Sequence, residues 1–162
     1  MIAWVESKKT VLNIAAAMKW MREEGPNRGQ SVEAILKSVG LAPGNPWCAA
    51  FVSWVGRTAL GKSWPLPMVG GCATLGEAAN RLEVLKKHPL TGSIFLIYKE
   101  SLNRFNHTGF ILEVTPDYCR TIEGNTSPDG SPEGTGVFER VREFDENDRF
   151  IYWWDIVPKE AP

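Results

Sequence analysis

Residues 45–55 read NPWCAAFVSWV, and this stretch decides how the chain folds. Asn45 is a typical N-cap and Pro46 suits the first helical turn, so we expect a helix over residues 47–60. The residues that follow the cysteine are apolar on every side of such a helix, which is typical of a helix buried inside a domain. The sequence therefore predicts a central buried helix with Cys48 in its first turn.

Helical patterns precede this segment, and strand patterns follow it. Apolar spacing predicts one helix over Lys8–Glu24 and another that Ser31 caps and Gly40 closes. A short fourth helix is expected from Thr74, where Glu77 would complete a capping box. Strands are expected at residues 93–98, 107–114, 118–123, 136–142 and 150–156. Helices first and antiparallel strands second indicate an α+β fold, with N-terminal helices packed on a C-terminal antiparallel β-sheet.

The length and composition are those of an ordinary globular protein. The chain has 162 residues, 43% hydrophobic and 23% charged, which suits a single domain over residues 1–162. A net charge of −1 without a basic stripe argues against a nucleic-acid partner. No segment approaches the roughly 18 apolar residues of a membrane span. Three cysteines and two histidines, widely spaced, predict neither a metal site nor a disulfide framework, and no cofactor is expected.

Cys48 is the candidate nucleophile. Its expected place in the first helical turn puts it beside unpaired backbone N–H groups and the positive end of the helix dipole, which favour the reactive thiolate. The same N–H groups are suited to holding an oxyanion. The alternative is an inert structural cysteine, because free cysteine is among the most buried residue types.

A predicted hairpin supplies a base and a partner that orients it. The two strands meet at the turn Thr115–Asp117, and counting back from this turn sets His107 opposite a position between residues 124 and 126. Glu123 and Asn125 share a face because side chains alternate along a strand. Either one can therefore orient the His107 imidazole toward a nucleophile. The alternative is a histidine satisfied by local hydrogen bonds at the start of a strand.

The remaining reactive or aromatic side chains have other expected roles. Cys72 follows two glycines and precedes a possible helix, but it lacks a nearby apolar helix to anchor it. Cys119 is expected to pack within a strand, and His88 to lie in a solvated charged turn. Trp47, next to the candidate nucleophile, is expected to wall the substrate cleft. The pair Trp153–Trp154 would place one ring on each face of a strand.

Several segments together resemble one known family. Residues Asn45–Val52 are similar to the nucleophile helix of CHAP domains, the cysteine, histidine-dependent amidohydrolases/peptidases. Gly92–Phe95 resembles the strand that leads to their histidine, His107–Ile111 the histidine strand, and Ile122–Thr126 the strand that carries their acidic and amide partners. The stretch Glu24–Gly29 is similar to phage and prophage members.

The resemblance covers residues 8–156 and implies a papain-like fold that hydrolyses peptidoglycan. The bond cut would be the sugar–peptide amide or a peptide bond within the stem or cross-bridge. By the same resemblance, Cys48 would be the nucleophile, His107 the base and Glu123 the third member with Asn125 in support, working through an acyl-enzyme.

Two other functions remain open. An acyltransferase or transpeptidase would use the same residues but let an amine resolve the acyl-enzyme, and a non-catalytic module would only bind wall polymer or another protein. The N-terminus lacks the pattern of a signal peptide, so we expect synthesis in the cytoplasm and delivery by another system to the cell wall, in the periplasm or outside the cell. The settings that fit are a phage lysin, a virion enzyme or a secreted toxin with a cognate immunity protein.

Overall fold

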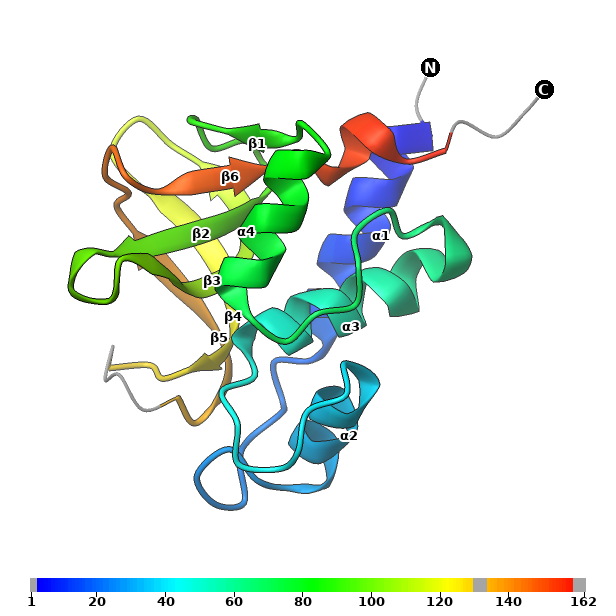
Figure 1. Ribbon diagram of the computed structural model, residues 1–162, viewed down its shortest axis with the longest axis vertical. Helices are drawn as coiled ribbons and strands as arrows, with labels where there is room; N and C mark the ends of the chain where they lie inside the picture. The colour runs from blue at the N-terminus through cyan, green and yellow to red at the C-terminus, as the bar shows by residue number, and fades with distance from the viewer. Residues whose placement is uncertain (1–2, 130–133, 159–162) are drawn as a thin grey trace.

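The computed structural model describes residues 3–129 and 134–158. Figure 1 shows the helices gathered on one side of a twisted sheet. The helices are α1 (Ala3–Ala17), α2 (Gln30–Ser38), α3 (Cys48–Leu60) and α4 (Cys72–Arg81). The strands are β1 (Leu85–Lys86), β2 (Ile94–Lys99), β3 (Arg104–Val114), β4 (Cys119–Thr126), β5 (Gly136–Arg142) and β6 (Arg149–Ile151). The strand order is β1-β6-β2-β3-β4-β5 with antiparallel pairing, so the predicted α+β class is confirmed.

Helix α3 occupies the centre of the core, as its apolar sequence predicts. Its N-terminal half is buried on all sides, between α1 and the strands β3 and β4. The predicted cap is wrong: the N-cap residue is Trp47, without a side-chain hydrogen bond, and Asn45 Nδ2 instead donates to the carbonyl oxygen of Ala42 at 2.8 Å. Cys48 is consequently the first residue of the helix.

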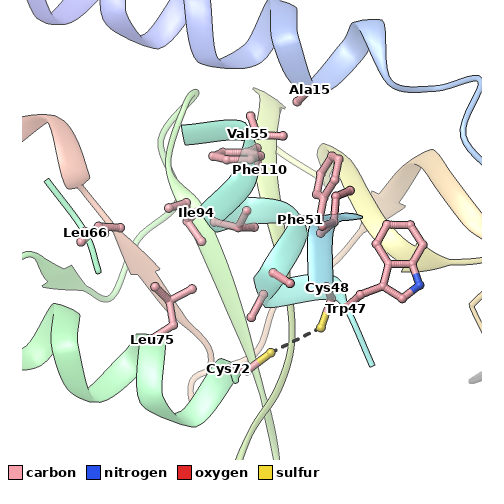
Figure 2. Packing of buried hydrophobic residues seen from close by; sticks show 14 of the residues in the cluster. Ala15, Trp47, Cys48, Phe51, Val55, Leu66, Cys72, Leu75, Ile94 and Phe110 are labelled. Carbon is pink, nitrogen blue, oxygen red and sulfur yellow. Dashed lines mark hydrogen bonds between the residues drawn. The ribbon is translucent and has the colours of Figure 1, made fainter. Parts of the chain in front are cut away.

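A glycine on β4 lets α3 approach the sheet closely. A Cβ atom built on Gly124 would lie 2.6 Å from Cγ of Phe51 and 2.8 Å from Cζ3 of Trp47. Phe51 also packs edge-on against Phe110 of β3, with ring centroids 6.5 Å apart (Figure 2). These contacts fix the start of α3 against β3 and β4, the two strands that carry the candidate base and its partner.

The first helix differs from its prediction at both ends. It spans residues 3–17 and not 8–24, because residues 21–23 leave the helix to lie along β5. The amide of Val137 donates to the carbonyl oxygen of Met21 at 3.1 Å, and the amide of Glu23 donates to Thr135 at 2.9 Å. Met21 stays buried, so the apolar pattern that suggested a longer helix reflects burial against the sheet edge.

Two predicted helix caps are also wrong. Helix α2 starts from Gly29, whose φ of 118° favours glycine, so Ser31 lies inside the helix. Helix α4 starts at Cys72, two residues before Thr74, and shows no side-chain capping bond, so the capping box with Glu77 is not formed. In both cases a glycine precedes the first helical residue.

The C-terminal strand is shorter than predicted. Strand β6 ends at Ile151, and residues Trp153–Ile156 form a 3₁₀ helix, which breaks the alternation expected for the tryptophan pair. Trp153 is fully buried and its Nε1 donates to the carbonyl oxygen of Gly92 at 2.9 Å, while Trp154 is half-buried. The indole hydrogen bond ties the chain end to the start of β2.

The substitution Gly124→Ala tests the close approach of α3 to β4. Since the new methyl group would overlap two buried rings, we expect a loss of about 1–3 kcal/mol in the free energy of unfolding. Chemical denaturation measures it. Gly25→Ala is the matched control, because its Cβ would meet nothing nearer than 3.7 Å. Equal stability of the two variants would contradict this account of the packing.

Candidate active site

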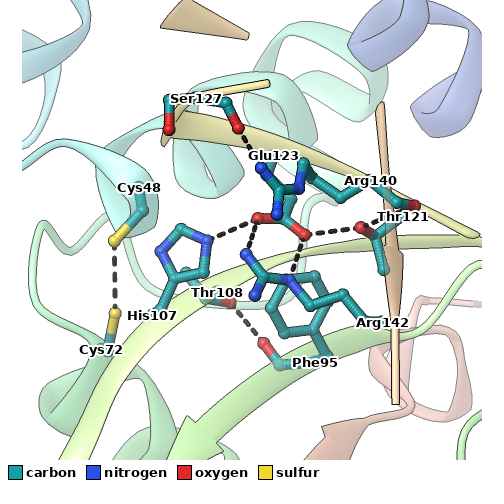
Figure 3. Close-up of polar contacts among 10 residues, drawn as sticks. All are labelled: Cys48, Cys72, Phe95, His107, Thr108, Thr121, Glu123, Ser127, Arg140 and Arg142. Carbon is teal, nitrogen blue, oxygen red and sulfur yellow. Dashed lines mark hydrogen bonds and ion pairs between the residues drawn. The ribbon is translucent and has the colours of Figure 1, made fainter. Parts of the chain in front are cut away.

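The structure brings Cys48, His107 and Glu123 to one place. Cys48 heads α3, His107 lies on β3 and Glu123 lies on β4. Figure 3 shows the imidazole between the other two side chains, with Nε2 toward Glu123 and the other ring nitrogen on the side of Cys48. Residues that the sequence separates by 59 and 16 positions thus form one line (Figure 3).

Strand register accounts for the contact between His107 and Glu123. Phe110 pairs with Ile122, and three residues further along each strand this register leads to His107 and Asn125, within the predicted interval. Nε2 of His107 donates at 2.6 Å to Oε2 of Glu123, which lies two residues along β4 from Asn125. A Cβ at Gly109 would lie 2.6 Å from the carbonyl oxygen of Ile122 and 3.0 Å from Cγ of Glu123, so this glycine leaves room for β4 and for the Glu123 side chain.

Two further side chains hold the Glu123 carboxylate, which is completely buried. Arg142 of β5 donates from Nε to Oε1 at 2.7 Å and from Nη2 to Oε2 at 2.6 Å. The Thr121 hydroxyl donates to Oε1 at 2.5 Å. Burial works against the ionised form, but the bonds to Arg142 and then His107 outweigh it and lower the Glu123 pKa to about 2. The carboxylate is therefore ionised and fixed at any physiological pH.

The imidazole sits between two negative partners. Burial alone would lower the His107 pKa, yet hydrogen bonds and charge from Cys48 and Glu123 exceed that effect and raise the pKa to about 9. Near neutral pH the ring is therefore an imidazolium. A cationic His107 in turn favours a thiolate at Cys48.

The thiol of Cys48 is strongly acidified. Its pKa lies well below the ordinary value because Cys72 donates a hydrogen bond to it, with Sγ to Sγ at 3.5 Å, and because His107 adds a second hydrogen bond and its charge. The pKa of Cys72 moves the opposite way, since its proton is held in that bond and its thiol is buried. The two pKa shifts together favour a charged Cys48 sulfur beside a protonated Cys72.

An open pocket of about 500 Å³ gives access to the line of residues. Cys48 and His107 both line it. Most of the remaining lining is polar or charged: Glu23, Asn27, Arg104, Asn106, Asn125, Thr126 and Arg142, with Pro26, Pro46, Ile97, Leu102 and Gly134. A pocket of this size and polarity suits a segment of a hydrophilic polymer with amide and hydroxyl groups.

Two of the predicted site residues are placed differently from expectation. Trp47 is fully buried, and its Nε1 donates to Oε1 of Glu23 at 2.8 Å, so the prediction that it walls the cleft is wrong. Glu23, held in this way, lines the pocket instead. Asn125 also lines the pocket, but no hydrogen bond joins it to His107 in the described residues, and its φ of 55° interrupts the alternation that would align it with Glu123.

Sequence reasoning missed the side chains that surround the three central residues. Cys72 was set aside for want of an anchoring helix, although it begins α4 and touches Cys48. Arg142 and Thr121 gave no signal beyond their strand positions. For Thr121 the available clue was its spacing of two from Glu123, which places both side chains on one face of β4.

The structure also places Cys119 and His88, the two remaining reactive side chains, as the sequence predicted. Cys119 is buried with Phe95, Ile111 and Phe150, as expected of packing, and His88 is exposed.

Within residues 3–129 and 134–158, no group of three or more His, Cys, Asp or Glu side chains is arranged to hold a metal ion. In the same ranges no helix is long and apolar enough to cross a membrane.

Solved structures of one known protein resemble this chain in fold. Ly7917, solved with the hydrolyzing product of MDP, aligns over 89% of this chain and 62% of its own, at 15% identity and a TM-score of 0.53. A second Ly7917 structure aligns over 89% and 61%, at 18% identity and a TM-score of 0.49. At such identities the likeness concerns the fold, and this chain spans less than two thirds of Ly7917. No curated protein matches the sequence.

The family comparison is the more informative one. The model of the CHAP domain matches residues 40–125, more than half of the chain. That range includes α3 from its first residue, β3 complete and β4 as far as Asn125, so it contains Cys48, His107 and Glu123. The chain belongs to the CHAP-domain family.

Proposed function

We propose that this protein hydrolyses an amide bond of bacterial peptidoglycan, with Cys48 as nucleophile, His107 as general acid and base, and Glu123 as the residue that orients His107. The main support for the proposal is that the acidified thiol of Cys48, the imidazole of His107 and the fixed carboxylate of Glu123 lie in a row beside an open polar pocket. Such an arrangement of nucleophile, base and orienting group is suited to acyl transfer.

The reaction begins from a thiolate–imidazolium pair. The Cys48 sulfur attacks the carbonyl carbon of the substrate amide, and the backbone N–H of Cys48 at the head of α3 donates to the developing oxyanion. His107 gives its proton to the leaving amine, and the C–N bond breaks to leave a thioester. His107 then takes a proton from water, whose oxygen attacks the thioester, and the released thiolate regains its imidazolium partner.

Glu123 keeps the imidazole in one orientation throughout these steps. Because Arg142 and Thr121 also hold the carboxylate, it cannot rotate away when His107 loses its proton. Its negative charge stabilises the imidazolium, which is the form that protonates the leaving amine. We place Asn125 in support at the pocket wall.

The substrate class follows from the family and from the pocket. CHAP-domain membership and the polar lining favour a sugar–peptide polymer, and Ly7917, which shares the fold, was solved with the hydrolyzing product of MDP. The bond is the sugar–peptide amide or a peptide bond of the stem or cross-bridge.

The substitution Cys48→Ala tests the nucleophile. We expect lysis of purified cell walls to fall by about a thousandfold or more, since the variant cannot form a thioester. Turbidity of the wall suspension gives the rate, and mass spectrometry of the released muropeptides identifies the bond and separates cleaved from newly joined products. Cys119→Ala, which removes a buried thiol that does not line the pocket, should keep its activity. Lysis by a folded Cys48→Ala protein at the rate of Cys119→Ala would disprove the mechanism.

The dependence of kcat/KM on pH tests the ion pair. His107 has a pKa raised to about 9, so the imidazolium persists through neutral pH and activity should fall as pH rises through about 9. In Glu123→Gln the lost negative charge lowers that pKa, and the alkaline decline should begin at lower pH, with the maximal rate reduced by about 10²–10⁴-fold.

The matched control is Glu113→Gln on the neighbouring strand. Glu113 pairs with Arg120 at 3.0 Å on the surface, where an ion pair contributes little. This variant should keep both the rate and the alkaline limit of the unaltered protein. An alkaline limit that stays unchanged in Glu123→Gln would show that Glu123 does not act through His107.

A further inference from the structure

A second thiol lies against the proposed nucleophile, and none of its bonds forms or breaks in the proposed acyl transfer. The Sγ atoms of Cys48 and Cys72 are 3.5 Å apart, and both residues are buried, with 5% and 7% of their surface exposed. Figures 2 and 3 show the two side chains pointing at each other from separate helices, α3 and α4. Each cysteine is the first residue of its helix.

This geometry is close to that of a bonded pair. A disulfide needs an S–S distance of about 2.0 Å, so the sulfurs must approach by roughly 1.5 Å from their present contact. Rotation of the two side chains about their Cα–Cβ bonds supplies that kind of movement. Cys119, in contrast, is packed among Phe95, Ile111 and Phe150 on the other core cluster.

We propose that Cys72 is a resolving cysteine, which forms a reversible disulfide with Cys48 after a hydroperoxide has oxidised Cys48. The bond masks the nucleophile and so switches hydrolysis off, and a dithiol reductant switches it on again. The regulatory part of this inference rests on the proposed function, because it requires Cys48 to be the nucleophile, whereas formation of the disulfide does not.

The chemistry balances with one equivalent of peroxide. The Cys48 thiolate attacks one oxygen, an S–O bond forms, the O–O bond breaks, and the departing hydroxide takes a proton from His107 to become water. The Cys72 sulfur then attacks the sulfur of the sulfenic acid, an S–S bond forms, the S–O bond breaks, and the leaving oxygen takes the Cys72 proton to become a second water. The two thiols are oxidised and the peroxide is reduced to two waters.

The surroundings of the two sulfurs favour this order of events. Among the described residues the pocket is lined by Cys48 and not by Cys72, so a small oxidant meets Cys48 first. The low pKa of Cys48 supplies the thiolate that peroxide requires. The pKa of Cys72 is raised by its bond to Cys48, by burial and by the charge of Cys48, and that charge is lost when Cys48 becomes a neutral sulfenic acid. The charge of Arg104, which lowers the Cys72 pKa, then favours the attacking thiolate.

Peptide mapping after peroxide treatment tests the inference. The protein is exposed to hydrogen peroxide, alkylated with iodoacetamide without reduction, digested with trypsin and analysed by mass spectrometry. Cleavage after Lys and Arg places Cys48 in residues 38–57, Cys72 in residues 63–81 and Cys119 in residues 105–120. We expect the first two peptides to be joined, and dithiothreitol to restore at least about nine tenths of the initial wall lysis.

Two variants make the result specific. Cys72→Ser keeps a hydroxyl beside Cys48 but cannot form the bond, so its Cys48 should proceed to the sulfinic acid and its own initial rate should not return with dithiothreitol. Cys119→Ser should behave as the unaltered protein does. Comparing each variant only with its own untreated rate removes any effect of Cys72→Ser on basal activity.

The contrary outcomes are equally definite. Cys48 recovered as the sulfinic acid beside an alkylated Cys72 in the unaltered protein would overturn the proposal, and so would a linkage that involves residues 105–120. The linked peptides are detected by mass and not by lysis. A missing linkage therefore leaves the Cys48→Ala result untouched, and a linkage in a protein that fails to cut walls would refute the proposed function alone.

Discussion

The contact between Phe51 and the backbone at Gly124 sets the distance between helix α3 and the sheet, and the site depends on that distance. Because a glycine stands on β4, the aromatic ring of α3 rests directly on the strand. The first residue of α3 is then held beside β3 and β4. Any larger residue would push the helix outward, and the thiol with it.

Side chains of alternating charge lie in a row beside this packed contact. Arg142, Glu123, His107 and Cys48 form a line of cation, anion, cation and anion, and the carboxylate in it is fully buried. Burying such charges is costly unless each has partners, which is why Glu123 accepts four hydrogen bonds from three side chains. The outcome is a rigid carboxylate that keeps the imidazole charged and a sulfur that is ionised before substrate arrives.

Sequence patterns predicted the parts of this arrangement that are local. The apolar run of α3, the turn that folds β3 onto β4 and the spacing of His107 and Glu123 all follow from periodicity within one or two elements. Helix ends were less predictable. Residues 21–23, for example, form backbone hydrogen bonds to residues 135–137 at the start of β5 and do not continue helix α1. Contacts between elements that are distant in the sequence have no local sequence pattern and were not predicted. Arg142 contacts Glu123 from a separate strand, and Cys72 contacts Cys48 from a separate helix. Trp47 shows the same limitation, since its position beside Cys48 suggested the cleft, whereas its indole is buried and donates to Glu23, which lines the pocket.

The central claim is that His107 is charged at rest because it lies between a thiolate and a carboxylate. Imidazole ¹⁵N chemical shifts report this charge directly, and His88→Gln removes the signals of the other histidine. At neutral pH we expect both ring nitrogens of His107 to be protonated in the His88→Gln protein, with deprotonation near pH 9. A His107 ring that is neutral at pH 7, with one unprotonated nitrogen, would contradict the account.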